Sequence, residues 1–249
     1  MNRKPFQGVL NIIRFNWHFY AISGLLFVFG AVLLPYLPDW LQFIVIVGIS
    51  LALLQILISL LVSWVVYDRS DLYAFKWLDL RQGSTVLNLN AGFDETSGLL
   101  KEKFPDIQLS VGDFYDSEQH TEVSIRRARA TYPLFPGTVN LSTAALPFAD
   151  DSFDVVLAIL SAHEIRNHKE RIDFFLELRR VVAPNGTIYV TEHLQDLPNF
   201  LAYSIGFLHF HNKMQWQQTF KKSGFTIIKE IKISFFITSF IIQSDGDSS

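Results

Sequence analysis

Hydrophobic residues are distributed unevenly along the chain, and two long apolar runs stand near its N-terminal end. The first covers residues 16–37 and the second covers residues 40–67, and both are almost free of charge. A helix needs ~20 apolar residues to cross a bilayer, and each run is long enough. Pro35 and Pro38 interrupt the pattern between them. Residues 1–67 are therefore predicted to form a hairpin of two transmembrane helices.

Two other interpretations of these runs stay open from the pattern alone. One is a buried helical hairpin in the core of a soluble protein, although soluble helices are rarely apolar on all sides over this length. The other is a cleaved signal peptide. The first run is long for a signal peptide, lacks a small-residue cleavage site and precedes a second span.

Basic residues predict how the hairpin is oriented. They flank it and are missing from its turn: Arg3, Lys4 and Arg14 precede it, and Arg69, Lys76 and Arg81 follow it. Lysine and arginine accumulate on the cytoplasmic side of membranes. We therefore expect an integral protein of the cytoplasmic or inner membrane, with both termini and the rest of the chain in the cytoplasm.

Residues 68–82 follow the second run and carry alternating aromatic and polar side chains. Asp68 or Ser70 is a candidate N-cap, so this segment is predicted to form a short interfacial linker helix. Such a helix can lie among the lipid headgroups or pack on the next domain, and both can hold at once.

From residue 83 to residue 243, short apolar strands alternate with helical stretches. This order predicts an α/β domain, a Rossmann-like, doubly wound and mostly parallel sheet. The last two apolar strands are joined by a short connection, so the final strand is expected to be antiparallel. The expected strands cover residues 84–92, 106–113, 137–143, 152–163, 187–194, 225–234 and 235–243. The polar residues 244–249 are expected to form a disordered tail.

Charge and cysteine content narrow the possible partners. The net charge is −3, which offers no electrostatic case for binding nucleic acid. The chain has no cysteine, which excludes disulfides, thiolate metal sites and a cysteine nucleophile. Neither observation predicts an oligomeric state.

Ligands of such sheets bind beyond the carboxyl ends of the strands. The first strand ends in the turn that holds Asn90 and Gly92, and the second ends at Asp113. Glycine tolerates a positive φ and a close approach of ligand to backbone. A single glycine is also compatible with an ordinary turn, and Asp113 with a solvated aspartate.

Several stretches of this domain resemble the class I S-adenosylmethionine-dependent methyltransferases of the type 11, or UbiE-like, kind. "VLNLNAGFD" stands where that family has its glycine-rich first motif, and "LSVGDFYD" matches the acidic end of its second strand. "ALPFADDSFDVVLA" and "ELRRVVAPNGTIYVTE" resemble the family's segments around strands four and five. The resemblance covers about 160 residues and implies S-adenosylmethionine as the cofactor.

The same resemblance implies a set of cofactor-binding residues. Asp113 would hold the ribose hydroxyls, and the neighbouring Phe114 would form part of an adenine slot. Thr143 and Ala144 would lie along the adenine edge. The remaining candidates come from the first turn and its surroundings, Asn88, Asn90, Gly92 and Asp94.

The first motif departs from the family pattern at several positions. Asn88 replaces its aspartate, Asn90 and Asp94 replace two of its glycines, and Asn185 replaces a glycine of a later turn. Asn88 lacks the family's charge at that position. A non-catalytic membrane scaffold with a degenerate methyltransferase fold therefore stays open as an alternative.

Candidate catalytic residues follow the fourth strand. His163 is the first candidate for a base or an acceptor-orienting residue, and Glu164 is the second. Packing or capping of the next helix is the alternative role for His163. His209 and His211 lie in an aromatic segment that can form a lid, but a metal site needs a third ligand and none has suitable spacing, so no metal is expected.

Together these patterns predict a membrane-anchored methyltransferase. Its expected acceptor is a lipophilic small molecule or a lipid, methylated on oxygen or carbon, because such a molecule concentrates at the bilayer. The sequence does not distinguish these acceptors from a membrane-associated protein that is methylated instead. The acceptor itself, the oligomeric state and the role of the hairpin beyond anchoring are left open.

Overall fold

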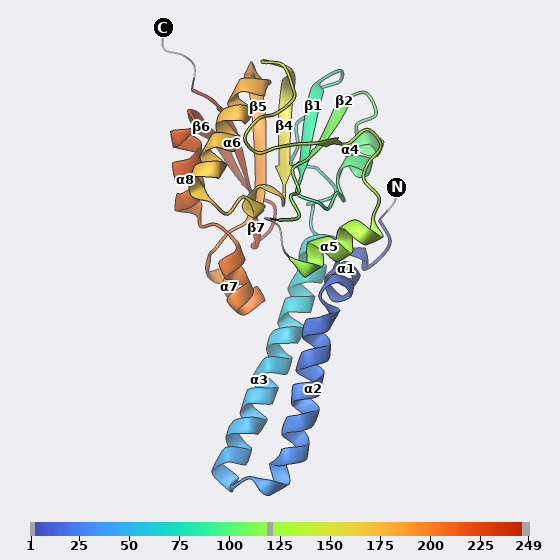
Figure 1. The fold of residues 1–249 in the computed structure, drawn as a ribbon, viewed down its shortest axis with the longest axis vertical. Helices are drawn as coiled ribbons and strands as arrows, with labels where there is room; N and C mark the ends of the chain where they lie inside the picture. Colours follow the sequence, from blue (N-terminus) through green and yellow to red (C-terminus); the bar gives the residue numbers. More distant parts are fainter. Residues whose placement is uncertain (1–2, 119–121, 246–249) are drawn as a thin grey trace.

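The computed structural model describes residues 3–118 and 122–245. A sheet covered by helices forms a head, and a long helical hairpin extends away from it (Figure 1). The seven strands have the order β3-β2-β1-β4-β5-β7-β6. All neighbouring strands are parallel except at β7, which runs antiparallel to β5 and to β6. This confirms the predicted doubly wound sheet with an antiparallel last strand.

The strands alternate with helices along the chain, as the pattern predicts. The strands are β1 (Thr85–Asn90), β2 (Gln108–Asp113), β3 (Val139–Asn140), β4 (Phe153–Ile159), β5 (Val182–His193), β6 (Phe225–Lys232) and β7 (Ile237–Ser244). The helices of the head are α4 (Ser97–Lys103), α5 (Val123–Thr131), α6 (His168–Val181), α7 (Leu197–Tyr203) and α8 (Lys213–Lys222), with 3₁₀ turns η3 (Ala162–Glu164) and η4 (Ser204–His209). Of the predicted tail, residues 246–249 lie outside the described residues.

The hairpin consists of α2 (Trp17–Leu33) and α3 (Asp39–Trp64), joined through the 3₁₀ turn η1 (Leu34–Tyr36). Both helices are long and apolar enough to cross a membrane, and their most apolar stretches are entirely unburied within the protein. A core hairpin of a soluble protein would be covered by other elements. The exposure of these apolar side chains therefore does not fit that interpretation.

An additional helix, α1 (Gln7–Phe15), precedes the hairpin and was not predicted from the sequence. It packs closely on the end of the second span, where a Cβ atom on Gly8 would lie 2.4 Å from the Cβ of Tyr67. The carboxylate of Asp68 accepts hydrogen bonds from the backbone N–H groups of Gly8 and Val9, at 2.8 and 2.9 Å. These donors are unpaired at a helix N-terminus, so Asp68 fixes α1 in place.

The prediction of a linker helix over residues 68–82 is wrong. The second span ends in a π-helical turn, η2 (Val65–Arg69), and the residues after it form turns. Asp68 binds α1 instead of capping a new helix, and Ser70 Oγ donates to the carbonyl of Val66. The aromatic and apolar side chains of the segment are buried because they pack on the sheet rather than facing lipid headgroups.

The hydrophobic core lies on both faces of the sheet. Side chains of α6 and α8, such as Phe174 and Trp216, cover one face. The other face is covered by α4 and by the turns after the second span, where Leu72 and Phe75 are fully or almost fully buried. The head therefore begins directly after the hairpin, without a free connecting segment.

Candidate functional site

The first strand-to-helix turn is built around buried amides and a carboxylate. Asn88 Nδ2 donates to Thr96 Oγ1 and Ser97 Oγ, both at 2.8 Å. Asp94 Oδ1 accepts from the backbone N–H groups of the same two residues, both at 2.9 Å. Two of the positions that differ from the family motif, Asn88 and Asp94, therefore fix the start of α4. The Asp94 carboxylate acts as a cap and is not among the residues that line the cavity described below.

Gly92 and Asp113 lie next to each other at the ends of β1 and β2, as the sequence predicts. Asp113 Oδ1 accepts from the backbone N–H of Gly92 at 2.8 Å and from that of Tyr115 at 3.0 Å. Gly92 has φ +91°, and a Cβ atom there would lie 2.6 Å from the Tyr115 ring. Asp113 Oδ2 pairs with the Arg129 guanidinium, so the second carboxylate oxygen is also engaged.

A cavity of about 230 Å³ lies beside this turn, at the carboxyl ends of β1 and β4. Its walls are the first turn, α1, α5, the turn η2 at the end of the hairpin, and the residue after η4. Residues from these elements include Asn90 and Phe93, Asn11 and Phe15, Ser124 and Ala128, Tyr67, and Phe210. His163 and Glu164 also line it, so the two predicted catalytic candidates face the same space as Asn90.

The other predicted cofactor residues do not line this cavity. Phe114 is 2% exposed and packs in the core against Phe174, with ring centroids 5.3 Å apart, so it cannot form an open adenine slot there. Thr143 Oγ1 donates to Glu170 at 2.6 Å, and the backbone N–H of Ala144 donates to Ser142 Oγ.

His163 is held by a buried carboxylate that the sequence analysis did not single out. Glu192, at the end of β5, is 0% exposed. It accepts from the backbone N–H of His163 at 3.1 Å and pairs with His163 Nδ1 at 2.6 Å. Burial acts to lower the pKa of His163, but the carboxylates of Glu192 and Glu164 outweigh it and raise the pKa to about 10.

Glu164 and His209 form a charged cluster with His163 at the turn η3. His163 Nε2 lies 3.3 Å from Glu164 Oε1, and His209 Nε2 lies 3.2 Å from the same oxygen. Burial acts to raise the pKa of Glu164, yet hydrogen bonds from the two histidines hold it well below its usual range. The carboxylate is therefore ionised at neutral pH.

The same three side chains place possible metal ligands within 4.8 Å of one another, which the spacing of the sequence did not reveal. The Arg166 guanidinium contacts the ring nitrogens of His209 and lies 3.9 Å from Glu164. A protein cation therefore already balances the carboxylate at this position, and the arrangement does not argue for a metal ion.

Another histidine, His193, joins the head to the end of the helical hairpin. Its Nδ1 faces two acceptors at 3.0 Å, Asn199 Oδ1 and the carbonyl of Phe236, and therefore carries the ring hydrogen. Its Nε2 lies 2.9 Å from the Tyr67 hydroxyl, which donates to it. Burial lowers the pKa of His193 to about 4, so the ring is neutral.

The chemistry of S-adenosylmethionine fits this site on the side of the first turn. Among the described residues, the buried Asn90 Nδ2 has no hydrogen-bond partner, and Asn90 lines the cavity. An amide donor of this kind suits an oxygen of the cofactor. Asp113, the predicted ribose-binding residue, does not line this cavity, and its second carboxylate oxygen pairs with Arg129.

The residues that the sequence analysis missed come from distant parts of the chain. Glu192 ends the strand next to β4, and a search for acidic strand ends would have found it. Tyr67 and Asn11 belong to the N-terminal region, whose role beyond anchoring the sequence left open. Nothing in the local sequence of α1 indicated that it walls a cavity.

Comparison with known proteins adds family information. A family profile described as "Methyltransferase domain" matches residues 112–190. The ubiquinone/menaquinone biosynthesis C-methyltransferase UbiE of Geotalea daltonii is 26% identical over 140 residues, which cover 55% of this chain and 56% of that protein. UbiE of Paracoccus denitrificans is 29% identical over 124 residues, covering 48% and 46%. The chain thus spans about half the length of the curated relatives it matches.

A solved S-adenosylmethionine-dependent methyltransferase of Aquifex aeolicus covers 70% of this chain and 93% of its own, with a TM-score of 0.49 and 14% identity. The family profile spans the segment from the end of β2 to β5, which contains Asp113, His163 and the pairing of β4 with β5. Residues 112–190 are therefore similar to a methyltransferase domain, and the strand order and the glycine turn of the head agree with that match.

Proposed function

We propose that the protein is a membrane-anchored methyltransferase whose acceptor is a lipophilic molecule with a hydroxylated aromatic ring. The observation that supports this most is the composition of one cavity. It brings together the first turn of the methyltransferase domain, the His163–Glu192 pair, and residues at the ends of the membrane hairpin. An acceptor dissolved in the bilayer reaches such a cavity without crossing the cytoplasm.

The bound cofactor supplies an electrophilic methyl carbon. Asp113 would hold its ribose hydroxyls in place of the Arg129 guanidinium, and the amide of Asn90 would bind one of its oxygens. Walls made of Phe15, Phe93 and Phe210 exclude water from the acceptor. Positioning two reactants in a dry cavity provides much of the acceleration of a methyl transfer.

His163 takes the proton of the acceptor hydroxyl. An ordinary imidazole, with a pKa of ~6.5, is a poor match for a phenol of pKa ~10. The raised pKa of His163, about 10, makes that proton transfer nearly balanced. Loss of the phenol proton makes both the oxygen and the ring carbons more nucleophilic. Either would form a bond to the methyl carbon as the bond from that carbon to the cofactor sulfur breaks, and a methylated ring carbon would then lose its own proton.

The UbiE relatives are named as C-methyltransferases of ubiquinone and menaquinone biosynthesis. A reduced quinone has both the hydroxylated ring and the lipid character that the cavity suits. We extend the acceptor class, though not a particular quinone, to this chain. Methylation of carbon and methylation of oxygen are distinguished by the mass fragments of the product.

The proposal places both termini and the head in the cytoplasm. Supporting residues are Arg3 and Arg14 before the hairpin and Arg69 and Arg81 after it, whereas its turn carries only Asp39. Protease treatment of sealed inner-membrane vesicles, inside-out and right-side-out, tests this orientation. The head should be digested only in inside-out vesicles, and digestion only in right-side-out vesicles contradicts it.

Calorimetry of the full chain in lipid nanodiscs tests cofactor binding. We expect S-adenosylmethionine to bind, Asp113→Ala to weaken binding, and the exposed Asp106→Ala to leave it unchanged. Incubation with a quinol and labelled cofactor then tests transfer. The alternative function, a non-catalytic scaffold, is favoured by the pairing of Arg129 with Asp113, and it predicts that no cofactor binds even to the unaltered chain.

A further inference from the structure

We propose that α7 and η4, residues 197–209, lie in the headgroup layer of the bilayer and form a lipid-contacting wall of the acceptor cavity. This inference rests on the membrane anchoring proposed above and adds a third element to it. The proposed partner is a lipid surface. Residues 197–209 are the part of the head that would contact both this surface and the cavity.

The outer side of this segment is apolar. Five large side chains are between 44% and 80% exposed, and together they are called the α7–η4 patch: Leu197, Phe200, Leu201, Ile205 and Leu208. So many exposed apolar side chains within a short segment mark a contact surface rather than ordinary protein surface. On its inner side, the segment buries Asn199 and Ala202.

A polar residue of the membrane hairpin fixes the height of the patch. Gln55 Nε2 donates to the carbonyls of Leu201 and Ala202, at 3.3 and 3.1 Å. These are C-terminal carbonyls of α7, which have no partner within their own helix. At the border of the bilayer core, where water is scarce, an unpaired amide or carbonyl is unfavourable, so each group satisfies the other.

The position of Gln55 corresponds to a membrane boundary. Gln55 lies 16 residues beyond Asp39, the start of α3, which is about 24 Å along a helix that rises about 1.5 Å per residue. The hydrocarbon core of a bilayer is about 30 Å thick. If α3 enters the membrane near Asp39, Gln55 and the α7–η4 patch lie close to the opposite interface.

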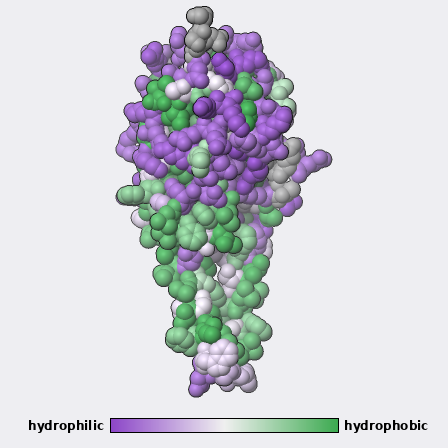
Figure 2. All heavy atoms as spheres, turned by 90° about the vertical axis from the view of Figure 1, so that its left-hand side faces the viewer, coloured by the Kyte–Doolittle hydropathy of each residue, from purple (hydrophilic) through white to green (hydrophobic). Residues whose placement is uncertain are grey.

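The patch continues the apolar surface of the hairpin. Figure 2 shows apolar residues extending from the hairpin up to the lower border of the head, where the polar surface begins. In Figure 1, α7 lies beside the upper part of α3. Continuity with the spans favours lipid as the occupant over a separate soluble partner.

Helix α1 presents a similar surface beside the start of α2. Phe6, Leu10 and Ile13 are exposed, whereas Asn11 and Phe15 on its other face are buried and line the cavity. A helix with one apolar outer face and one packed face suits the interface of a bilayer. Two walls of the cavity, α1 and the end of η4, would therefore lie next to the lipid headgroups.

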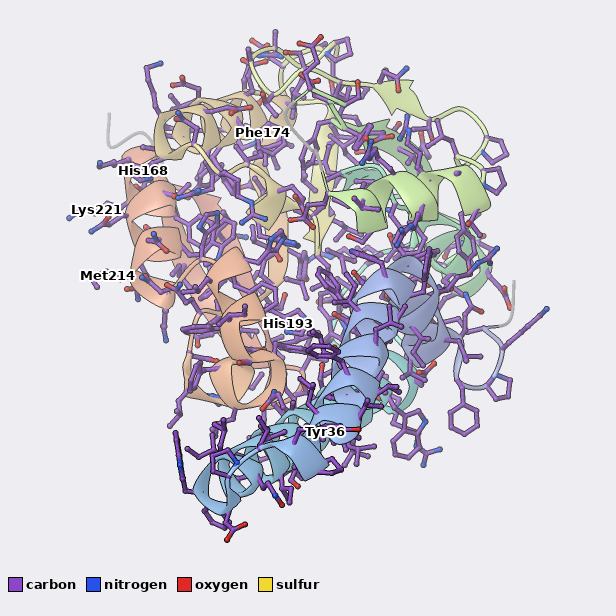
Figure 3. The ribbon with its side chains drawn as sticks, turned by 60° about the horizontal axis from the view of Figure 1, so that its bottom comes forward. Tyr36, His168, Phe174, His193, Met214 and Lys221 are labelled. Carbon is purple, nitrogen blue, oxygen red and sulfur yellow. The ribbon has the colours of Figure 1, made fainter. Side chains whose placement is uncertain are left out.

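The inner side of the segment contacts the site. His193 accepts from Tyr67 through Nε2 and binds Asn199 of α7 through Nδ1. Phe210, directly after η4, stacks on His193 with ring centroids 4.8 Å apart and lines the cavity. Figure 3, viewed from the hairpin side, shows His193 between the orange α7–η4 segment and the blue N-terminal helices. Lipid that contacts the outer side of residues 197–209 would therefore affect the position of a cavity wall.

Because the chain has no cysteine, single cysteines can be introduced and labelled with a nitroxide. The full chain in nanodiscs would carry the label at Ile205→Cys, at Phe29→Cys in α2, or at Ile228→Cys, an exposed position on β6. Electron paramagnetic resonance then compares collisions with oxygen, which enriches in lipid, and with a water-soluble nickel complex.

We expect the label at position 205 to favour oxygen, as the label at position 29 does, and the label at position 228 to favour nickel. A label at position 205 that behaves like the one at position 228, while position 29 reports lipid, overturns this inference and leaves the anchoring intact. Water exposure at position 29 overturns the anchoring as well. Dipolar broadening at position 205 that disappears on dilution with unlabelled chain assigns the patch to a second copy and also overturns the inference.

A functional test uses the double variant Ile205→Asp with Leu208→Asp, and Ile228→Asp as the control. The double variant should raise KM for a long-tailed acceptor in vesicles by about fivefold, which corresponds to ~1 kcal/mol. KM for a short, water-soluble acceptor and the Kd for cofactor should stay unchanged. An equal rise for both acceptors points to a general structural defect and contradicts the role in lipid contact.

Discussion

Glu192 binds both the backbone N–H and the ring Nδ1 of His163, so the end of β5 fixes the imidazole that follows β4. The two strands are neighbours in the parallel sheet, and Ile159 of β4 pairs with Thr191 of β5. The orientation of His163 is therefore set by the sheet as well as by the turn η3 in which it lies. This leaves Nε2 on the cavity side, beside Glu164.

The first prediction concerns the pH dependence of methyl transfer. His163 must lose its own proton before it can accept one, so kcat/KM should rise with pH towards the pKa of about 10. Glu192→Gln removes a carboxylate that raises this pKa, so the rise should move to lower pH. Initial rates between about pH 6 and about pH 10 measure it. His168→Gln, on the exposed start of α6, should keep the original profile, and an unshifted profile for Glu192→Gln contradicts the role of the pair.

The second prediction concerns competition for Asp113. Arg129, whose side chain is 29% exposed, occupies the carboxylate oxygen that a ribose hydroxyl needs. Partly exposed ion pairs contribute up to about 1 kcal/mol, so Arg129→Met should tighten cofactor binding by up to about fivefold. Asp113→Asn should weaken it, because a neutral amide is a poorer acceptor. Calorimetry distinguishes these outcomes from a stabilising role of Arg129, which predicts weaker binding for both variants.

The third prediction concerns the packing of α1 on Tyr67. A Cβ atom on Gly8 would meet Tyr67 at 2.4 Å, so Gly8→Ala should displace α1 from the end of the second span. Overpacking of this kind costs about 1–3 kcal/mol. We expect faster cleavage near α1 by added protease and a higher KM for the acceptor. Gly24→Ala, with no atom within 4 Å of its new methyl group, is the matched control and should behave like the unaltered chain.

The fourth prediction concerns the turns that replace the predicted linker helix. Leu72 is fully buried against the sheet, and its truncation to alanine should destabilise the head by about 2–5 kcal/mol. Leu134→Ala, at a 39% exposed position, should have little effect. Thermal unfolding of the detergent-solubilised chain, followed by circular dichroism, measures both. Equal stability of the two variants would mean that residues 70–80 form a dispensable tether.

The sheet was predictable because its pattern is local. Each buried strand is a short apolar run, and the alternation with helices determines that the runs are parallel. The place of Asp113 beside Gly92 follows from that order, since parallel strands bring their carboxyl ends to one edge. The antiparallel β7 was indicated by its short connection to β6.

The parts that were not predictable depend on contacts between distant segments. Asp68 and Tyr67 acquire their roles from α1, which lies about 60 residues earlier in the chain. The aromatic residues after the hairpin have a pattern that suits a bilayer surface and a sheet surface equally well, and only packing shows that the sheet is covered. Phe114 follows a strand end, but its ring turns into the core towards Phe174.

The bond between Asp68 and α1, together with the burial of Leu72 and Phe75, leaves no slack between hairpin and head. With the membrane anchoring proposed above, the cavity would lie at a fixed depth relative to the lipids. Acceptors would then be selected by the depth of their reactive group, so a ring held deeper in the bilayer by a substituent would not be methylated.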